Sequence, residues 1–286
     1  MTREERSEVY MNTISAIKNL GYEVNKKFIP LKGAKKLKEN SVFYPKLSKL
    51  PDTDVKFETK IYVENIDCLV KAKEFGENGI LLNMASRKKP GGGVFSGSAA
   101  QEEDIFRRSN LGVSLYQFHQ DYKDIYMIGE DKNIEGYPIT SEISGIYSPG
   151  VTVFRDISDN DYDFLEDQYI TSVVTVPAVQ RPELTEDGKI SKRFIKMWKN
   201  KIRSVFRISL MNNHTKLILG AWGCGAYCNP PEHVAILFKE VLDESEFTGK
   251  FEEICFAILE DYNSYQEHNK SGNIKPFADI FGFKNK

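Results

Sequence analysis

The stretch Pro90-Gly91-Gly92-Gly93-Val94-Phe95-Ser96-Gly97-Ser98-Ala99-Ala100-Gln101-Glu102-Glu103 is the most informative part of this 286-residue sequence. Its three consecutive glycines predict nearly bare backbone amides in a loop that tolerates positive φ and can approach a phosphate or a sugar closely. The adjacent acids Glu102 and Glu103 offer a proton donor or a base beside whatever the loop holds. The combination predicts a catalytic loop rather than a purely structural turn.

A second glycine-bearing stretch lies far along the chain, at Gly220-Ala221-Trp222-Gly223-Cys224-Gly225-Ala226-Tyr227-Cys228-Asn229-Pro230-Pro231. It fits a dinucleotide-binding fingerprint poorly, because Cys228 occupies the third glycine position and two prolines delay the next helix. Exposed amides at Gly223, Gly225 and Ala226, backed by a helix N-terminus, nevertheless suit a diphosphate. We therefore expect a diphosphate-binding loop here.

Before, between and after these two loops, predicted strands alternate with predicted helices along the chain. Apolar runs predict strands at 61–63, 79–83, 146–154 (interrupted at 148–150), 171–177, 216–219 and 254–259, and helical spacing predicts helices at 68–75, 104–111, 192–210 and 232–242. Strands separated by helices call for a sheet covered on both faces, with ligand loops at the carboxyl ends of its strands. Both glycine loops follow such strands. The pattern predicts an α/β/α sandwich in which the two loops share one cleft.

Residues 1–58 depart from this alternation. A helical repeat runs from Val9 to Leu20, and the pattern then weakens up to about Lys60, where proline and glycine punctuate the sequence. We expect residues 1–58 to form a mostly helical accessory segment packed on a catalytic domain that spans 59–286.

Bulk composition excludes several classes of protein. Hydrophobic residues make up 41% of the chain and aromatic residues 12%, as in globular rather than disordered proteins. A net charge of −2 gives no global attraction to nucleic acid or membranes. Since neither a signal region nor a membrane-spanning stretch is present, we expect a cytoplasmic protein. Cys68, Cys224, Cys228 and Cys255 are too scattered for a disulfide framework or a zinc site, and we expect no metal or cofactor.

The two loops carry a family resemblance. Gly91-Gly92-Gly93, followed after seven residues by Gln101-Glu102-Glu103, resembles the signature of microbial-type poly(ADP-ribose) glycohydrolases, and 220–231 is similar to the family's diphosphate loop. The resemblance covers roughly residues 60–262 and implies a macrodomain with a mixed sheet that hydrolyses ADP-ribose linkages. It implies poly(ADP-ribose) or ADP-ribosylated macromolecules as partners and ADP-ribose as product, with neither a membrane nor a sequence-specific nucleic acid involved.

The resemblance also implies roles for single residues. Glu103 would protonate the leaving ribose hydroxyl and then activate water, while Glu102 and Asn83 would hold the distal ribose and Gln101 would support the loop. Asp67 would accept a hydrogen bond from the adenine amino group, although an N-cap role is equally open and both could coexist. The remaining substrate-binding residues belong to the two loops and are Gly91, Gly92, Gly93, Gly223, Cys224, Gly225, Ala226 and Tyr227. Ordinary packing is the alternative for Asn83 and Tyr227.

Three functions stay open on the sequence. The first is an exo-acting poly(ADP-ribose) glycohydrolase, the second a hydrolase of single ADP-ribosyl units on an acceptor, and the third a non-catalytic reader of ADP-ribose. Retention of both acids argues against the reader, because a reader needs the phosphate loop but not the proton donor.

Charged residues around the loops raise further expectations. Asp104 is expected to cap the helix that follows it, and Arg107 and Arg108 to pair locally or lie in solvent. Arg87-Lys88-Lys89 adds three positive charges beside the glycine loop, and 189–207 holds eight basic residues and no acidic ones. Either basic stretch would attract polymer phosphates or be a solvated face.

Overall fold

The computed structural model describes the whole chain except residues 52–53, 55, 131, 261–263 and 285–286. Across the described residues, seven strands form one central sheet in the order β3-β6-β7-β5-β8-β9-β4. Their bounds are β3 Val42–Tyr44, β4 Lys60–Glu64, β5 Gly79–Met84, β6 Gly145–Arg155, β7 Phe164–Val176, β8 Lys216–Leu219 and β9 Glu253–Ala257. The strands from β7 to β4 in this order are parallel, whereas β6 and β3 are antiparallel to their neighbours, so the predicted mixed sheet is confirmed.

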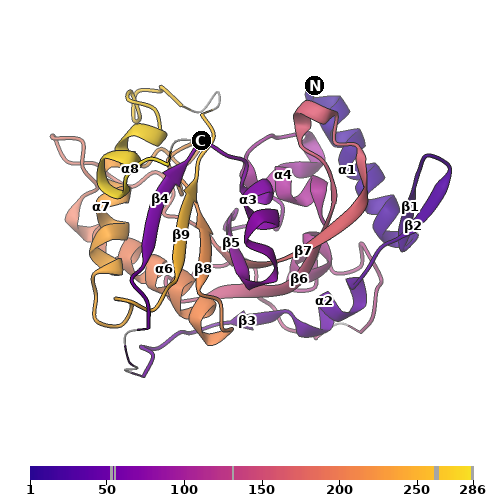
Figure 1. Cartoon of the computed structure of the whole chain (residues 1–286), viewed down its shortest axis with the longest axis horizontal. Helices are drawn as coiled ribbons and strands as arrows, with labels where there is room; N and C mark the ends of the chain where they lie inside the picture. The colour runs from indigo at the N-terminus through magenta and orange to yellow at the C-terminus, as the bar shows by residue number, and fades with distance from the viewer. Residues whose placement is uncertain (52–53, 55, 131, 261–263, 285–286) are drawn as a thin grey trace.

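Helices cover both faces of the sheet. One face carries α1 (Arg3–Lys18), α3 (Cys68–Phe75), α4 (Gln101–Arg108) and α5 (Leu111–Tyr116), and the other carries α6 (Lys192–Met211), α7 (Pro231–Leu242) and α8 (Ile274–Phe281). Figure 1 shows α7 and α8 on one side of the strands and α1 and α4 on the other. Within the described ranges, none of the helices has the length and apolarity needed to cross a membrane.

The central strand β5 explains why this arrangement forms. Successive side chains of a strand point to opposite faces, and β5 is apolar on both. Ile80 and Leu82 pack into the core cluster beneath α6, α7 and α8, whereas Leu81 packs into the cluster beneath α1, α3 and α4. A strand buried on both faces requires helices on both, and the predicted α/β/α sandwich is confirmed.

Several boundaries differ from the sequence prediction. The expected break at 148–150 is a bulge inside a continuous β6. The helix predicted at 104–111 is two helices, α4 and α5, and α4 begins three residues earlier, at Gln101. Three short 3₁₀ turns, η1 (Gly76–Asn78), η2 (Val94–Ser96) and η3 (Ser158–Asn160), and α8 were not predicted. Bulges and short helices depend on contacts that a local pattern does not contain.

The N-terminal segment is less helical than expected. After α1 it forms a hairpin of β1 (Gly21–Val24) and β2 (Lys27–Pro30), then α2 (Ala34–Asn40) and the edge strand β3. β3 pairs with β6, so this segment contributes a strand to the central sheet. α1 packs on η2 and α4, next to the acid pair. The boundary at residue 58 itself stays a prediction.

Candidate active site

The glycine loop holds the two acids rather than a ligand. The Gly91 amide donates to Glu102 Oε1 at 3.1 Å and the Gly93 amide donates to Glu103 Oε1 at 2.9 Å. The Gly92 amide closes a turn on the Lys89 carbonyl at 3.0 Å. The expectation of three bare amides is therefore wrong. Its physical reason is the early start of α4, which places both acids in the first helical turn and folds them back over the loop.

Gly92 lies where both carboxylates converge. A Cβ atom at this position would lie 2.6 Å from Glu103 Oε1 and 3.2 Å from Glu102 Oε2, and the residue has a φ of +52°. Only glycine avoids both the collision and the strain of a left-handed conformation. The glycine run is thus required by the approach of the acids to the backbone.

Glu102 is buried and bonded at both oxygens. Besides Gly91, the Ser86 amide donates to Oε2 at 2.6 Å and Asn83 Nδ2 lies 3.4 Å from Oε1. Burial raises the pKa of Glu102 to about 8, with the charge of Glu103 adding to the effect and the amide hydrogen bonds opposing it. Burial thus favours the protonated form of Glu102, which would reduce the repulsion between the two acids.

Asn83 and Gln101 fix the end of β5 against α4. The Gln101 side chain accepts from the Met84 amide at 2.9 Å and donates to the Leu82 carbonyl at 2.8 Å, which ties the start of α4 to the strand. Asn83 is fully buried and its Oδ1 has no partner among the described residues. An unpaired buried acceptor is costly unless a ligand satisfies it. Oδ1 is thus available to a ribose hydroxyl.

Tyr137 is a candidate that the sequence pattern does not single out. It is 3% exposed, and its hydroxyl has no hydrogen-bond partner among the described residues. Burial raises the pKa of Tyr137 well above its ordinary value, and the nearby Glu102 and Tyr227 raise it further. An orphaned hydroxyl beside the acid pair suits a ligand contact. Its stretch, 119–147, has no periodicity from which this position could have been found.

The second loop has the free amides that the first loop lacks. The backbone amides of Gly223, Gly225 and Ala226 donate to no described residue, and α7 begins just beyond them at Pro231. Cys228, which replaces the third glycine of the dinucleotide fingerprint, has a φ of +53°. It therefore adopts the left-handed backbone conformation that glycine would favour. Free amides next to a helix N-terminus suit a diphosphate.

Asn229, also unassigned from the sequence, holds this loop in shape. Its Nδ2 donates to the carbonyls of Val179 at 2.7 Å and Gly223 at 2.9 Å, and its Oδ1 accepts from Trp198 Nε1 at 3.0 Å. Asn229 is fully buried. Four polar contacts, with the Tyr227 carbonyl at 3.2 Å as the fourth, fix the loop whose amides face outward.

The two loops meet at one edge of the sheet. β5 and β8 are parallel neighbours, so their carboxyl ends lie side by side. The Tyr227 hydroxyl lies 3.5 Å from the Ala85 carbonyl, and a Cβ on Gly220 would collide with the Met84 side chain. The fold thus brings together the acid-holding loop (90–100) and the amide-bearing loop (220–230). The acid pair lies at the same end of the sheet as the free amides, which suit a diphosphate.

The charged residues around the site differ from expectation. Asp67 does cap α3, accepting from Leu69 and Val70 amides, and also pairs with Arg108 Nη1 at 3.0 Å. Asp104 does not cap α4. It accepts from Arg108 at 2.8 Å and from Tyr162 at 2.8 Å instead, because Ala100 occupies the N-cap position.

Arg107 and Arg108 are almost fully buried, so they do not lie in solvent, and the alternative of local pairing is confirmed for Arg108, which pairs with Asp104. Arg107 donates to the carbonyls of Arg6 and Ser98 and so links α1 to the acid-holding loop. The adenine role of Asp67 stays a prediction, with one of its oxygens, Oδ2, bonded only to Arg108 within the described chain.

Comparison with known protein families identifies the chain's family. The family model described as microbial-type PARG (poly(ADP-ribose) glycohydrolase), catalytic domain, matches residues 11–156. The chain belongs to this family. No curated protein sequence matches it. Membership in the PARG family makes the chain a glycohydrolase, which confirms the prediction of an enzyme.

Solved PARG structures match nearly the whole chain. Poly(ADP-ribose) glycohydrolase from Thermomonospora curvata, bound to the inhibitor ADP-HPD, is 26% identical with a TM-score of 0.74 and covers 96% of this chain and 99% of its own. The enzyme from Deinococcus radiodurans, in complex with ADP-ribose, is 24% identical with a TM-score of 0.65, covering 88% of this chain and 98% of its own. The macrodomain-like fold of this PARG is thereby confirmed.

Among the described residues of this PARG, no group of three or more His, Cys, Asp or Glu side chains is arranged to hold a metal ion.

Proposed function

We propose that this PARG hydrolyses the ribose–ribose O-glycosidic bond of poly(ADP-ribose) and releases ADP-ribose, with Glu103 as general acid and then general base. The observation that carries the proposal is the state of the Glu103 carboxyl. Oε1 accepts from the Gly93 amide, whereas Oε2 accepts from no described residue. One oxygen is thus fixed and the other is available to a substrate, on the same edge as the free amides of the second loop.

The chemistry requires a proton on the leaving oxygen, stabilisation of an oxocarbenium-like carbon and delivery of water. In the proposal, Glu103 donates that proton through Oε2, and the resulting carboxylate then accepts a proton from the attacking water. Glu102 has both oxygens bonded to the protein and is thereby suited to positioning rather than proton transfer. A diphosphate held nearby would favour the cationic carbon electrostatically.

The rest of the site supports binding of an ADP-ribose unit. The unpaired Asn83 Oδ1 and the Glu102 carboxyl would receive the hydroxyls of the distal ribose. The free amides of Gly223, Gly225 and Ala226 would take the diphosphate, with Cys224 between them and Tyr227 against the ribose. The adenine would lie toward Asp67 at the start of α3. Binding of ADP-HPD and ADP-ribose by the two solved relatives supports the same class of ligand for this chain.

Two substitutions test the assignment of the acids. Glu103→Gln retains the acceptor that the Gly93 amide needs, so ADP-ribose binding should persist while turnover falls by about 10²–10⁴-fold, the usual contribution of a general acid–base. Glu102→Ala should weaken both binding and turnover, because it removes a ribose contact. Calorimetric titration with ADP-ribose separates the two effects. Glu103→Gln with near-normal turnover would remove Glu103 from its role.

The substrate is tested with two purified substrates and mass identification of the products. From automodified polymer we expect free ADP-ribose and a residual unit left on the acceptor protein. Complete stripping of an acceptor that carries a single ADP-ribose unit would favour a mono-ADP-ribosyl hydrolase instead. Binding of both substrates without release would favour a non-catalytic reader.

A further inference from the structure

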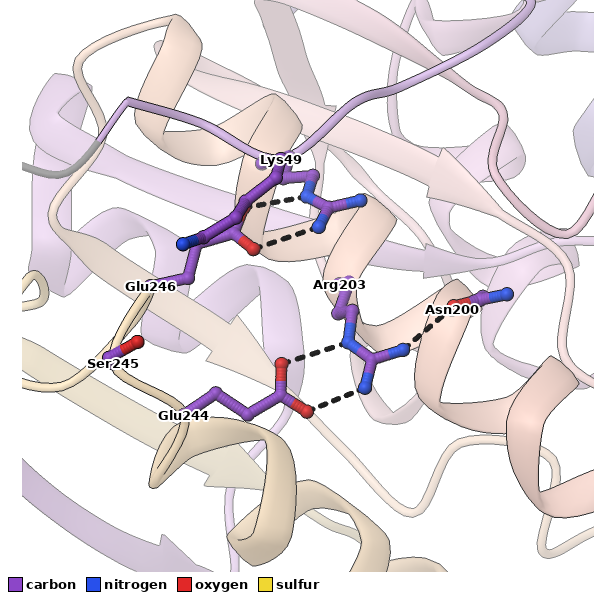
Figure 2. A pocket seen from close by; sticks show the side chains of 7 residues that line it. Lys49, Asn200, Arg203, Glu244, Ser245 and Glu246 are labelled. Atoms are coloured by element: carbon purple, nitrogen blue, oxygen red, sulfur yellow. Dashed lines mark hydrogen bonds and ion pairs between the residues drawn. The ribbon is translucent and has the colours of Figure 1, made fainter.

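Most of the basic side chains in the long stretch at 189–207 are already paired with acids. Five of its basic side chains have acidic partners at 2.7–3.2 Å, in the pairs Lys189–Asp187, Arg193–Glu183, Lys199–Glu240, Arg203–Glu244 and Arg207–Glu246. Figure 2 shows the guanidinium of Arg203 directed at Glu244, in a hollow of about 460 Å³. A cation already paired with a carboxylate contributes little to binding a phosphate. α6 therefore presents mostly ion-paired cations, with Lys192 and Lys196 exposed and bonded to no acid that the structure describes, and whether it binds polymer stays a prediction.

The shorter basic stretch, Arg87-Lys88-Lys89, has the opposite character. All three side chains are exposed, and none makes a hydrogen bond or an ion pair with a residue that the structure describes. Lys201 on α6 is buried, with 4% exposed, and the charge of Arg87 helps to lower its pKa. Three exposed cations without a bonded acid thus follow one another along this turn.

This cluster adjoins the acid pair. The Lys89 carbonyl accepts from the Gly92 amide at 3.0 Å, so these residues form a tight turn whose end Cα atoms lie within about 7 Å. Gly92 is the residue on which the Glu102 and Glu103 carboxylates converge. On its other side, the cluster borders Tyr227, whose hydroxyl lies beside the Arg87 amide. The cations therefore lie at the rim of the site, meaning the exposed turn beside the acid pair. In the proposed reaction, the leaving oxygen would be protonated close to this turn.

We propose that Arg87, Lys88 and Lys89 bind the diphosphate of the penultimate ADP-ribose unit, the unit that leaves when the bond is cut. This inference rests on the proposed function. The proposed function accounts for the terminal unit by the second loop, whose amides are free, whereas the amides of Gly91 and Gly93 are occupied by the two acids. The leaving unit carries its own two phosphates, and a cluster of unpaired cations is the element of this rim that matches them.

A contact to the leaving unit has a defined kinetic signature. It lowers the KM for polymer, but it is absent from a substrate whose leaving group carries no phosphate. The contact is also electrostatic and exposed, so it weakens as salt rises. Both features separate it from a structural role, which would affect all substrates equally.

The test compares Lys88→Ser/Lys89→Ser with Lys26→Ser/Lys27→Ser. The control pair is also adjacent in sequence and exposed, forms no ion pair with a described residue, and lies on the β1–β2 hairpin away from the acid pair. Both variants change the net charge equally. Steady-state kinetics are measured on poly(ADP-ribose) at salt concentrations of about 25–300 mM. Over this range the Debye length shortens, so interactions between exposed charges become progressively screened. The second substrate is ADP-ribose joined at its anomeric carbon to an uncharged chromophore.

We expect the Lys88/Lys89 variant to raise the KM for polymer about fivefold at low salt, as two exposed contacts of about 0.5 kcal/mol each would. Its salt dependence should flatten, its kcat should change little, and the chromophore substrate should be hydrolysed as by the wild type. The control variant should behave as the wild type on both substrates. Melting temperatures of the three proteins confirm that the comparison is between folded enzymes.

Three results would overturn the inference. One is an unchanged polymer KM in the Lys88/Lys89 variant while the wild type still releases ADP-ribose, which leaves the proposed function intact. Another is an equal loss on the chromophore substrate, which would assign these lysines to the terminal unit. The third is an equal rise in the polymer KM of the Lys26/Lys27 variant, which would make the effect one of net charge. If the wild type cuts neither substrate, the proposed function itself fails.

Discussion

Gly97 is the position where the N-terminal helix and the acid-holding loop can be separated by one methyl group. Its φ is +71°, and an added Cβ would lie 2.6 Å from the carbonyl carbon of Arg3 and closer still to its oxygen. Around this contact, Arg6 Nε donates to the Gly97 carbonyl at 2.7 Å and Ser7 donates to the Phe95 carbonyl at 2.7 Å. Gly97→Ala should therefore push the start of α1 away from the loop.

The expected loss in the free energy of unfolding of Gly97→Ala has two parts. A left-handed alanine costs about 1 kcal/mol relative to glycine. Relief of the collision, by displacement of packed backbone, costs about 2 kcal/mol more. We expect a loss of about 3 kcal/mol in the free energy of unfolding. Because Gly93, which bonds Glu103, belongs to the same loop, a shift of about 1 Å should also lower kcat by up to about 100-fold.

Gly150→Ala is the matched control. Gly150 has a φ of +69°, and a Cβ there would meet nothing within 4 Å. It should show the left-handed cost of about 1 kcal/mol without the collision, and normal kcat. Urea denaturation of both variants, followed by tryptophan fluorescence, and ADP-ribose release from polymer give the two readouts. Equal unfolding midpoints and equal kcat in the two variants would refute the claim that the contact between α1 and Gly97 holds the acid-holding loop in place.

Three further substitutions test other parts of the site. Tyr137→Phe removes an orphaned buried hydroxyl, so stability should be unchanged or rise by about 1 kcal/mol while kcat/KM falls, and unaltered kinetics would exclude a ligand contact. Asn229→Leu removes the contacts that hold the diphosphate loop and should raise the Kd for ADP-ribose more than tenfold (about 1.4 kcal/mol), measured by calorimetry. Burial lowers the pKa of Lys201 to about 8, below its ordinary 10.5, with Arg87 assisting and Glu142 opposing. Both the folded and unfolded states are protonated below pH 8, so Lys201→Met should stabilise by at most about 3 kcal/mol there. That gain should shrink as pH rises from 8 toward 10.5, and an equal gain at pH 6 and pH 10 in urea titrations would contradict the burial argument.

The sequence by itself determined the layered architecture and the position of the two loops. Apolar strands such as 216–219 must be buried on both faces, and β8 coincides with that prediction. The glycine run and the acid pair at 91–103 likewise marked a loop that follows a strand and precedes a helix, which is where the structure has it. Local steric and hydrophobic rules are sufficient for such features, because they depend on residues that are near one another in the chain.

Only the tertiary structure decided which backbone amides and charged side chains have a partner within the protein and which are free to bind a ligand. The amides of Gly91 and Gly93 are consumed by Glu102 and Glu103, whereas those of the second loop stay free, and no sequence pattern distinguishes the two loops in this respect. The same holds for the five paired cations within 189–207 and the unpaired cations at 87–89. A hydrogen bond or an ion pair forms between atoms brought together from distant segments, so its existence depends on rotamer and register across the whole fold rather than on local spacing.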